Sequence, residues 1–238
     1  MIRLSLHQRR FCLTAVLLLP NVAAADGIIV DKIYDPYVHP LEKEIEARFV
    51  GQTDNQTPDL QKYSLGFGRT ISDRWAVELY TIAFRTPGES VSVDTYELEA
   101  KWQLTEQGEY AADWGLLFEL ERGTEENSWE LTTQLLTARD FGRISTTANL
   151  GVLYERGEKI KNEFETTLRL QARYRLRESF EPAVELHVGQ NTVAFGPTIL
   201  GLVRIAKGRK LRWEFGVFTG IDKKSPDQII KANFEFEF

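Results

Sequence analysis

The sequence has no long apolar run beyond its first 25 residues, so nothing there is suited to cross a bilayer as a helix. Its one cysteine, Cys12, lies within those first residues, which leaves the remainder without a disulfide framework. Only three histidines are present. The net charge of −6 argues against a basic nucleic-acid surface. We therefore expect no cofactor, no metal and no nucleic-acid partner.

The N-terminus has the three parts of a secretory leader. Arg3, Arg9 and Arg10 form a basic region, residues 11–20 form a short apolar core, and small residues lead to Ala25. This pattern resembles a signal peptide over residues 1–25, with cleavage after Ala25. The core is too short to span a bilayer. The mature chain is thus expected outside the cytoplasm.

The C-terminus alternates strictly between apolar and polar side chains from Ile230 to Phe238. A strand with one face in lipid and the other toward a polar lumen needs this alternation. The ending resembles the closing strand of Gram-negative outer-membrane barrels. That resemblance implies recognition by the barrel-assembly machinery through Phe234, Phe236 and Phe238, and contact with outer-membrane lipid and lipopolysaccharide. The competing interpretation is an amphipathic edge strand of a soluble sandwich.

Similar alternation recurs about every fifteen residues and predicts about twelve strands. We expect an all-β fold, a transmembrane antiparallel up-and-down barrel occupying residues 41–238. An even strand number lets the sheet close with both chain ends on one side, which leaves no unpaired edge in lipid. The clearest predicted strands are Glu44–Phe49, Tyr63–Gly68, Ile144–Tyr154, Phe164–Tyr174, Phe180–Gln190, Phe195–Ala206, Leu211–Gly220 and the strand closing at Phe238.

Aromatic residues recur at the predicted strand ends, where the two membrane interfaces would lie. With both chain ends in the periplasm, the residues expected near the periplasmic interface are Trp75, Trp102, Trp114, Tyr174, Trp213 and Phe238. Those expected near the external interface are Tyr63, Tyr96, Trp129, Tyr154 and Phe164. Aromatic core residues of a soluble sandwich would not cluster in this way.

The predicted inward faces are crowded with charge. Candidate lumen-lining residues are Glu44, Glu46, Arg48, Glu97, Glu99, Lys101, Glu119, Glu165, Arg169, Arg173, Glu185, His187, Arg212, Glu214, Lys231 and Glu235. In a water-filled lumen they would sort polar solutes by charge, which favours a narrow channel or transporter for small polar or charged solutes. If they pair across the centre, the barrel is sealed and structural.

An outer-membrane enzyme is the third and least favoured interpretation. His187 points inward beside Glu185, but Ser179, the nearest serine, lies at the far end of the strand. No nucleophile is therefore placed next to a base by the sequence. An acid and histidine site in the lumen stays open as an alternative. His39, between prolines, has no second ligand at metal spacing.

Residues 26–40 precede the barrel as a periplasmic segment or a plug. They contain too much proline for a strand and too many apolar residues for a free tail. We hypothesise that they narrow the periplasmic mouth, with the small inward residues Ser64, Gly66 and Gly68 leaving them room. Deletion should then raise conductance. The predicted external loops are short and polar, which makes a large receptor domain improbable.

Overall fold

The computed structural model describes residues 28–55, 58–124, 127–158 and 162–238. The predicted signal peptide, its cleavage site and parts of three predicted loops lie outside the described residues. Within these described ranges, no helix is long and apolar enough to cross a membrane.

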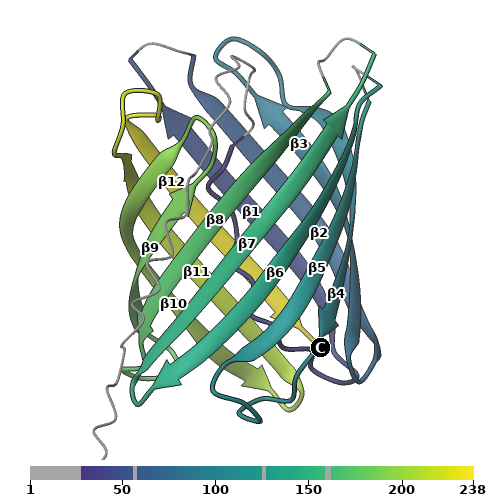
Figure 1. Ribbon diagram of the computed structural model, residues 1–238, viewed down its shortest axis with the longest axis vertical. Coiled ribbons are helices and arrows are strands. Elements are labelled where there is room, and N and C mark those ends of the chain that lie inside the picture. The colour runs from purple at the N-terminus through teal and green to yellow at the C-terminus, as the bar shows by residue number, and fades with distance from the viewer. Residues whose placement is uncertain (1–27, 56–57, 125–126, 159–161) are drawn as a thin grey trace, which may run out of the picture.

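The described chain forms a closed antiparallel barrel of twelve strands, each hydrogen-bonded to its sequence neighbours (Figure 1). The predicted all-β, twelve-stranded fold is confirmed. The strands are β1 (Lys43–Thr53), β2 (Leu60–Ser72), β3 (Trp75–Arg85), β4 (Ser92–Gln103), β5 (Asp113–Gly123), β6 (Trp129–Phe141), β7 (Ile144–Arg156), β8 (Glu163–Tyr174), β9 (Glu181–Val188), β10 (Val193–Ala206), β11 (Arg209–Gly220) and β12 (Gln228–Glu237).

The first and last strands close the barrel. β1 pairs with β12 from Glu44 opposite Glu237 to Thr53 opposite Gln228. Phe238 and Lys43 then exchange two backbone hydrogen bonds of 2.8 and 3.2 Å. Both chain ends of the barrel therefore meet at one rim, which we name the seam end. The opposite rim, where β1 runs into β2, is the loop end.

Side-chain exposure alternates along the strands as the period of a β-strand requires. On β12, Ile229 is 1% exposed, Ile230 is 49% exposed and Lys231 is 4% exposed. The exposed apolar set forms the outer face, and the buried set lines the lumen. In a barrel that spans a membrane, this alternation keeps a charged side chain such as Lys231 out of contact with lipid, where it would be costly.

The strands start or end one to four residues from their predicted bounds, and β2 and β9 show two causes. β2 is longer, because its backbone pairing with β1 and β3 continues past the residues that alternate clearly. β9 is shorter and ends at Val188, since the Gly189 N–H donates to the Thr192 carbonyl at 2.7 Å and closes a tight turn. That turn lies against the N-terminal segment, because a Cβ atom on Gly189 would be 2.8 Å from Ile29.

Candidate functional site in the barrel lumen

All sixteen predicted lumen residues are on described strands, and none is exposed. Nine are buried, namely Glu46, Arg48, Glu97, Glu99, Glu165, Glu185, His187, Lys231 and Glu235. The other seven are half-buried. Two charge clusters bring many of them together, one around Arg48 and one around Lys231.

The Arg48 cluster joins β1, β3 and β4. The Arg48 guanidinium group lies 3.0 Å from a Glu46 carboxylate oxygen and 3.4 Å from a Glu99 carboxylate oxygen. It also donates to the Tyr80 hydroxyl at 2.6 Å and lies 4.3 Å from the centre of the Tyr80 ring. Tyr80 covers Gly66, where an added Cβ would collide with the ring. The expectation that Gly66 leaves room for the N-terminal segment was therefore wrong, because Tyr80 fills that space.

The Lys231 cluster joins β9, β11 and β12. The Lys231 ammonium lies 2.7 Å from Glu185 and 2.5 Å from Glu214. His187 Nε2 is 2.9 Å from the same Glu185 carboxylate, and the imidazole meets the Phe218 ring edge-on. Ser179 lies in the turn before β9, where its carbonyl faces Gly201. His187 thus belongs to a carboxylate and ammonium network, and its described contacts include no serine.

The N-terminal segment, residues 28–40, lies within the lumen. Its backbone or side chains contact strands from all around the wall, including β1, β4, β7 and β12. A segment that touches so many sides of a closed barrel can only be inside it. Ile28 and Val30 lie near the loop end, whereas the His39 carbonyl accepts a 2.7 Å bond from Thr70 near the seam end. The segment therefore runs along the lumen from the seam end to the loop end, and is not confined to the mouth at the seam end.

Side chains of the lumen bind the backbone of this segment. Asn149 accepts from the Tyr34 N–H and donates to the Tyr34 carbonyl, both at 2.8 Å. Gln103 accepts from the Val38 N–H at 2.7 Å. Lys231 donates to the Asp31 carbonyl at 3.2 Å, in addition to its carboxylate contacts. Buried backbone groups need such partners, and here they come from side chains.

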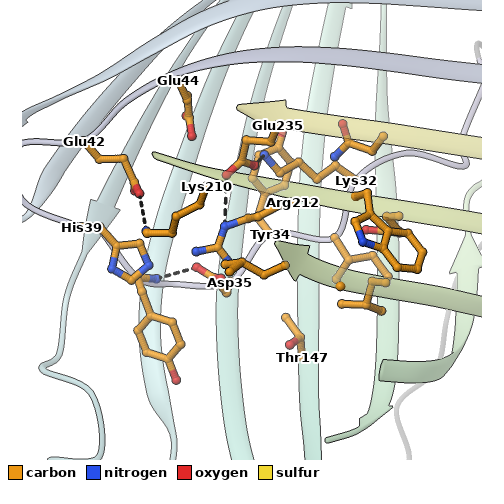
Figure 2. A pocket seen from close by; sticks show the side chains of 18 of the residues that line it. Lys32, Tyr34, Asp35, His39, Glu42, Glu44, Thr147, Lys210, Arg212 and Glu235 are labelled. Carbon is orange, nitrogen blue, oxygen red and sulfur yellow. Dashed lines mark hydrogen bonds and ion pairs between the residues drawn. The ribbon is translucent and has the colours of Figure 1, made fainter. Parts of the chain in front are cut away.

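Asp31 and Lys32 of the segment each contact wall residues of the opposite charge. Asp31 lies 3.0 Å from the Lys62 ammonium and 3.7 Å from the Arg48 guanidinium. Lys32 lies 2.9 Å from both Glu46 and Glu235. Figure 2 shows Lys32 near Glu235. Adjacent residues of an extended chain point in opposite directions, so one acid and one base are each paired within the same short stretch.

Apolar residues of the segment bind two apolar patches of the lumen. Ile28 and Val30 pack with a group of inward residues at the loop end, Val50, Ala194, Phe218 and Ile229. Tyr34 packs with Leu117 and Leu136 in the second patch, and its hydroxyl donates to Glu99 at 2.6 Å. Pro36 approaches Gly115 so closely that a Cβ atom there would be 3.0 Å from the proline Cβ.

A polar cavity of about 510 Å³ lies in the half of the lumen toward the seam end. Its walls carry both signs of charge, from Lys101 and Arg173 and from Asp35, Glu44 and Arg212, which are labelled in Figure 2. Water and small polar solutes can occupy such a space without losing hydrogen bonds.

Glu42 lies at the seam end of this cavity, just before β1. Burial raises the pKa of Glu42 to about 7, and the nearby Glu237 adds to the rise. Lys210, 3.1 Å away, opposes it. This carboxyl group therefore titrates close to neutral pH.

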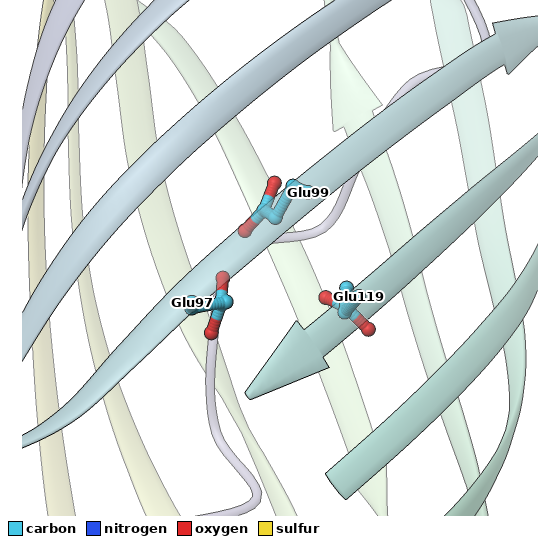
Figure 3. A group of neighbouring side chains, drawn as sticks. All are labelled: Glu97, Glu99 and Glu119. Atoms are coloured by element: carbon cyan, nitrogen blue, oxygen red, sulfur yellow. The ribbon is translucent and has the colours of Figure 1, made fainter. Parts of the chain in front are cut away.

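Three carboxylates form an acidic group on β4 and β5. Glu97, Glu99 and Glu119 place one oxygen each within 4.8 Å of the others (Figure 3). Glu99 already accepts from the Tyr34 hydroxyl, and Glu119 accepts from Gln134 at 2.7 Å. These carboxylates form one acidic side of the lumen, facing the bases that hold the segment.

The aromatic residues predicted at the interfaces lie on the outer face. Trp75 and Trp102 stack with ring centroids 5.2 Å apart near the seam end. Trp114 is 38% exposed, and Phe238, at the seam itself, is 43% exposed. Trp129 is 48% exposed near the loop end, with Arg122 over its ring. Trp213 packs beside Phe215.

Sequence reasoning missed several residues that hold the segment. These are Lys62, Gln103 and Asn149 on the wall, and Asp31, Lys32 and Tyr34 in the segment itself. The alternation of β2, β4 and β7 places the three wall residues inward, but the predicted lumen set includes no residue of β2 or β7 and ends at Lys101 on β4. The available signal was the set of inward amides, which suit a backbone partner.

Comparisons with known proteins identify the fold. No family model matches the chain, and no curated protein matches its sequence. An outer-membrane channel from Pseudomonas putida F1 is a similar solved structure, with a TM-score of 0.59, 12% identity and coverage of 87% of this chain and 98% of that one. The KdgM porin in complex with disordered oligogalacturonate is similar with a TM-score of 0.55 and 12% identity. The match covers 82% of this chain and 98% of that one.

The translocator domain of the autotransporter NalP from Neisseria meningitidis is also similar, with a TM-score of 0.53, 12% identity and coverage of 86% and 90%. The chain therefore has the fold of porin-like outer-membrane barrels.

Proposed function

We propose that this protein is a narrow, non-enzymatic channel for small polar or charged solutes in the bacterial outer membrane. The signal peptide would be removed near Ala25 during export. The interpretation as a sealed structural barrel is the alternative that the experiment below must exclude.

The observation that carries the proposal is the polar cavity inside a closed outer-membrane barrel. The cavity of about 510 Å³ is bounded by Arg173 and Arg212 on one side and by carboxylates such as Glu44 on another. Rings of charged side chains in a water-filled lumen are the usual means by which such pores select solutes. The similar solved structures include an outer-membrane channel and a porin in complex with an oligogalacturonate, which supports the same function.

The N-terminal segment would be the closed gate of this channel. It crosses the part of the lumen that lies between the cavity and the loop end, where Val30 is fully buried and Tyr34 is 2% exposed. Conduction then requires the segment to move or leave. Its contacts with the wall are hydrogen bonds, ion pairs and apolar packing, which can be exchanged for water.

The outer surface supports placement in the outer membrane. The stacked Trp75 and Trp102 suit one interface, and the exposed Trp129 suits the other. Lipid and lipopolysaccharide would contact the apolar face between them. Phe234, Phe236 and Phe238 would be read by the assembly machinery before the seam closes.

The test is the single-channel conductance of the folded barrel in a planar bilayer, with and without residues 26–40. The intact chain should give rare or small steps, and the deletion variant should give larger and more frequent steps. Folding is checked in each case by the shift in mobility on heating in detergent. The reversal potential across a salt gradient then shows which sign of charge passes more easily.

A Lys223→Met variant is the matched control, because Lys223 lies in an exposed loop between β11 and β12. It should conduct like the intact chain. A deletion variant that is folded but silent would reject the channel and favour the sealed barrel.

A further inference from the structure

The lumen holds the N-terminal segment in the way that a binding site holds a peptide. Strand pairing does not provide the contacts. Instead, the Asn149 amide binds both backbone groups of Tyr34, Gln103 binds the Val38 N–H and Lys231 binds the Asp31 carbonyl. These bonds recognise main-chain groups that every peptide has. A ligand without a peptide backbone would leave the buried Asn149, which is 0% exposed, without its pair of partners.

The side-chain contacts add selectivity to this backbone recognition. One subsite is basic, where Lys62 and Arg48 face Asp31. The next is acidic, where Glu46 and Glu235 face Lys32.

A third subsite lies two residues further along the segment. Leu117 and Leu136 contact the Tyr34 ring, and Glu99 accepts from its hydroxyl. The three subsites match an acidic residue, a basic residue and, two positions later, a tyrosine.

We propose that the lumen vacated by residues 28–38 is a binding site for extended peptides supplied from outside the chain, and that peptides with this side-chain order are its preferred ligands. The proposal rests on the proposed function, because the site is free only when the segment has left the lumen. It names the class of solute that the channel would hold. In the closed protein the segment is its own ligand, bound in place of a free peptide.

The tether explains why the site must be tested in the deletion variant. The segment joins β1 directly at Lys43, so its effective concentration at the site is in the millimolar range or above. A free peptide of moderate affinity could not compete with it. Removing residues 26–40 eliminates the competitor and leaves every wall contact in place, because Asn149, Gln103 and the charged subsites all lie on strands.

The experiment measures binding of a synthetic peptide with the sequence of residues 28–40 to the folded deletion variant. Binding is followed by calorimetry in detergent and by block of the conductance in a bilayer. A second peptide has the same composition, with the residues at positions 31 and 32 exchanged. We expect saturable binding of one native peptide per barrel, and binding at least about tenfold weaker for the exchanged peptide, since each charge then faces its own sign.

Two wall variants separate backbone recognition from general adhesion. Asn149→Leu should lower the affinity of the deletion variant for the native peptide roughly tenfold, because two hydrogen bonds are lost. Asn233→Leu is the matched control, since Asn233 is also a buried asparagine on the barrel wall and its Oδ1 atom has no hydrogen-bond partner. It should bind the peptide like the parent.

The outcomes distinguish this proposal from the channel itself. If the deletion variant conducts but binds neither peptide saturably, or binds both equally, the peptide site is wrong and the channel stands. If the deletion variant is silent but binds the native peptide selectively, the site stands and the channel is wrong. Equal weakening by Asn149→Leu and Asn233→Leu would also overturn the backbone recognition.

Discussion

Replacing Lys32 with methionine should loosen the N-terminal segment while keeping the volume of the side chain. The Lys32 ammonium lies 2.9 Å from Glu46 and 2.9 Å from Glu235, and its side chain is 16% exposed. The two acids are more deeply buried, at 1% and 11%. The substitution therefore removes a cation from a poorly solvated position between two carboxylates.

The expected loss in stability of the seated segment depends on the ion-pair partners that Glu46 and Glu235 keep. Breaking a fully buried ion pair costs about 3–5 kcal/mol, because the remaining charge is left alone. Here Glu46 keeps Arg48 at 3.0 Å, and Glu235 keeps Arg212 at 3.3 Å. We therefore expect a smaller loss of about 1–3 kcal/mol for the seated segment, which raises the released population roughly 5- to 150-fold.

The assay is the rate at which a hydrophilic maleimide labels a cysteine at position 30. The predicted mature chain has no other cysteine, and Val30 is 0% exposed when the segment is in place. When release is fast and reversible, the labelling rate follows the released population. The Val30→Cys parent and its Lys32→Met derivative are compared in the same detergent.

Two further variants make the result decisive. Lys223→Met, an exposed loop substitution of the same kind, should leave the labelling rate unchanged. Adding Glu235→Gln to Lys32→Met should recover part of the protection, because one of the uncompensated acids is then neutral. Equal labelling with and without Lys32, or an equal rise in the Lys223 control, would refute the role given to this ion pair.

Three other predictions follow from the same geometry. Gly115→Val should raise the conductance of the intact chain, because its side chain would occupy the space of Pro36, 3.0 Å from the proline Cβ. The pKa of Glu42 is raised to about 7, above its usual 4.5, so the folded state holds the extra proton and loses stability as pH rises from 4.5 to 7. Glu42→Gln should flatten that loss in urea titrations of the barrel. Deleting Phe238 should lower the amount of assembled barrel in cells but leave refolding in detergent nearly unchanged, and an equal loss in both would argue against an assembly signal.

The barrel could be predicted from the sequence because its cause is local. Every spanning strand must alternate between lipid and lumen, so the stretch from Ile230 to Phe238 shows the pattern by itself. The strand ends were less predictable. Pairing with a neighbour extends β2 past its alternating part, and the turn at Gly189 shortens β9.

The path of the N-terminal segment could not be predicted in the same way, because its contacts are distant in sequence. Lys32 and Glu235 are 203 residues apart, and Tyr34 and Asn149 are 115 apart. The segment also lacks a strand period, since side chains bind its backbone. Only closure of the barrel brings these partners together. The charged lumen residues were identified and the segment was expected at the mouth, but the individual contacts between them were not predicted.

One local signal for the segment was nevertheless present. Val50, Phe218 and Ile229 occupy inward positions, where a water-filled lumen would favour polar residues. Covering an apolar side chain of this size is worth about 1.5–3 kcal/mol, so an inward apolar group implies something apolar to cover it. Ile28 and Val30 do so.

Departure of the segment would thus uncover an apolar patch on the four neighbouring strands β10, β11, β12 and β1 near the loop end. A peptide that carries apolar residues ahead of its acid and base would cover the patch again, whereas a small ion would not. Under the proposed peptide site, this patch would therefore favour peptides whose residues ahead of the acid and base are apolar.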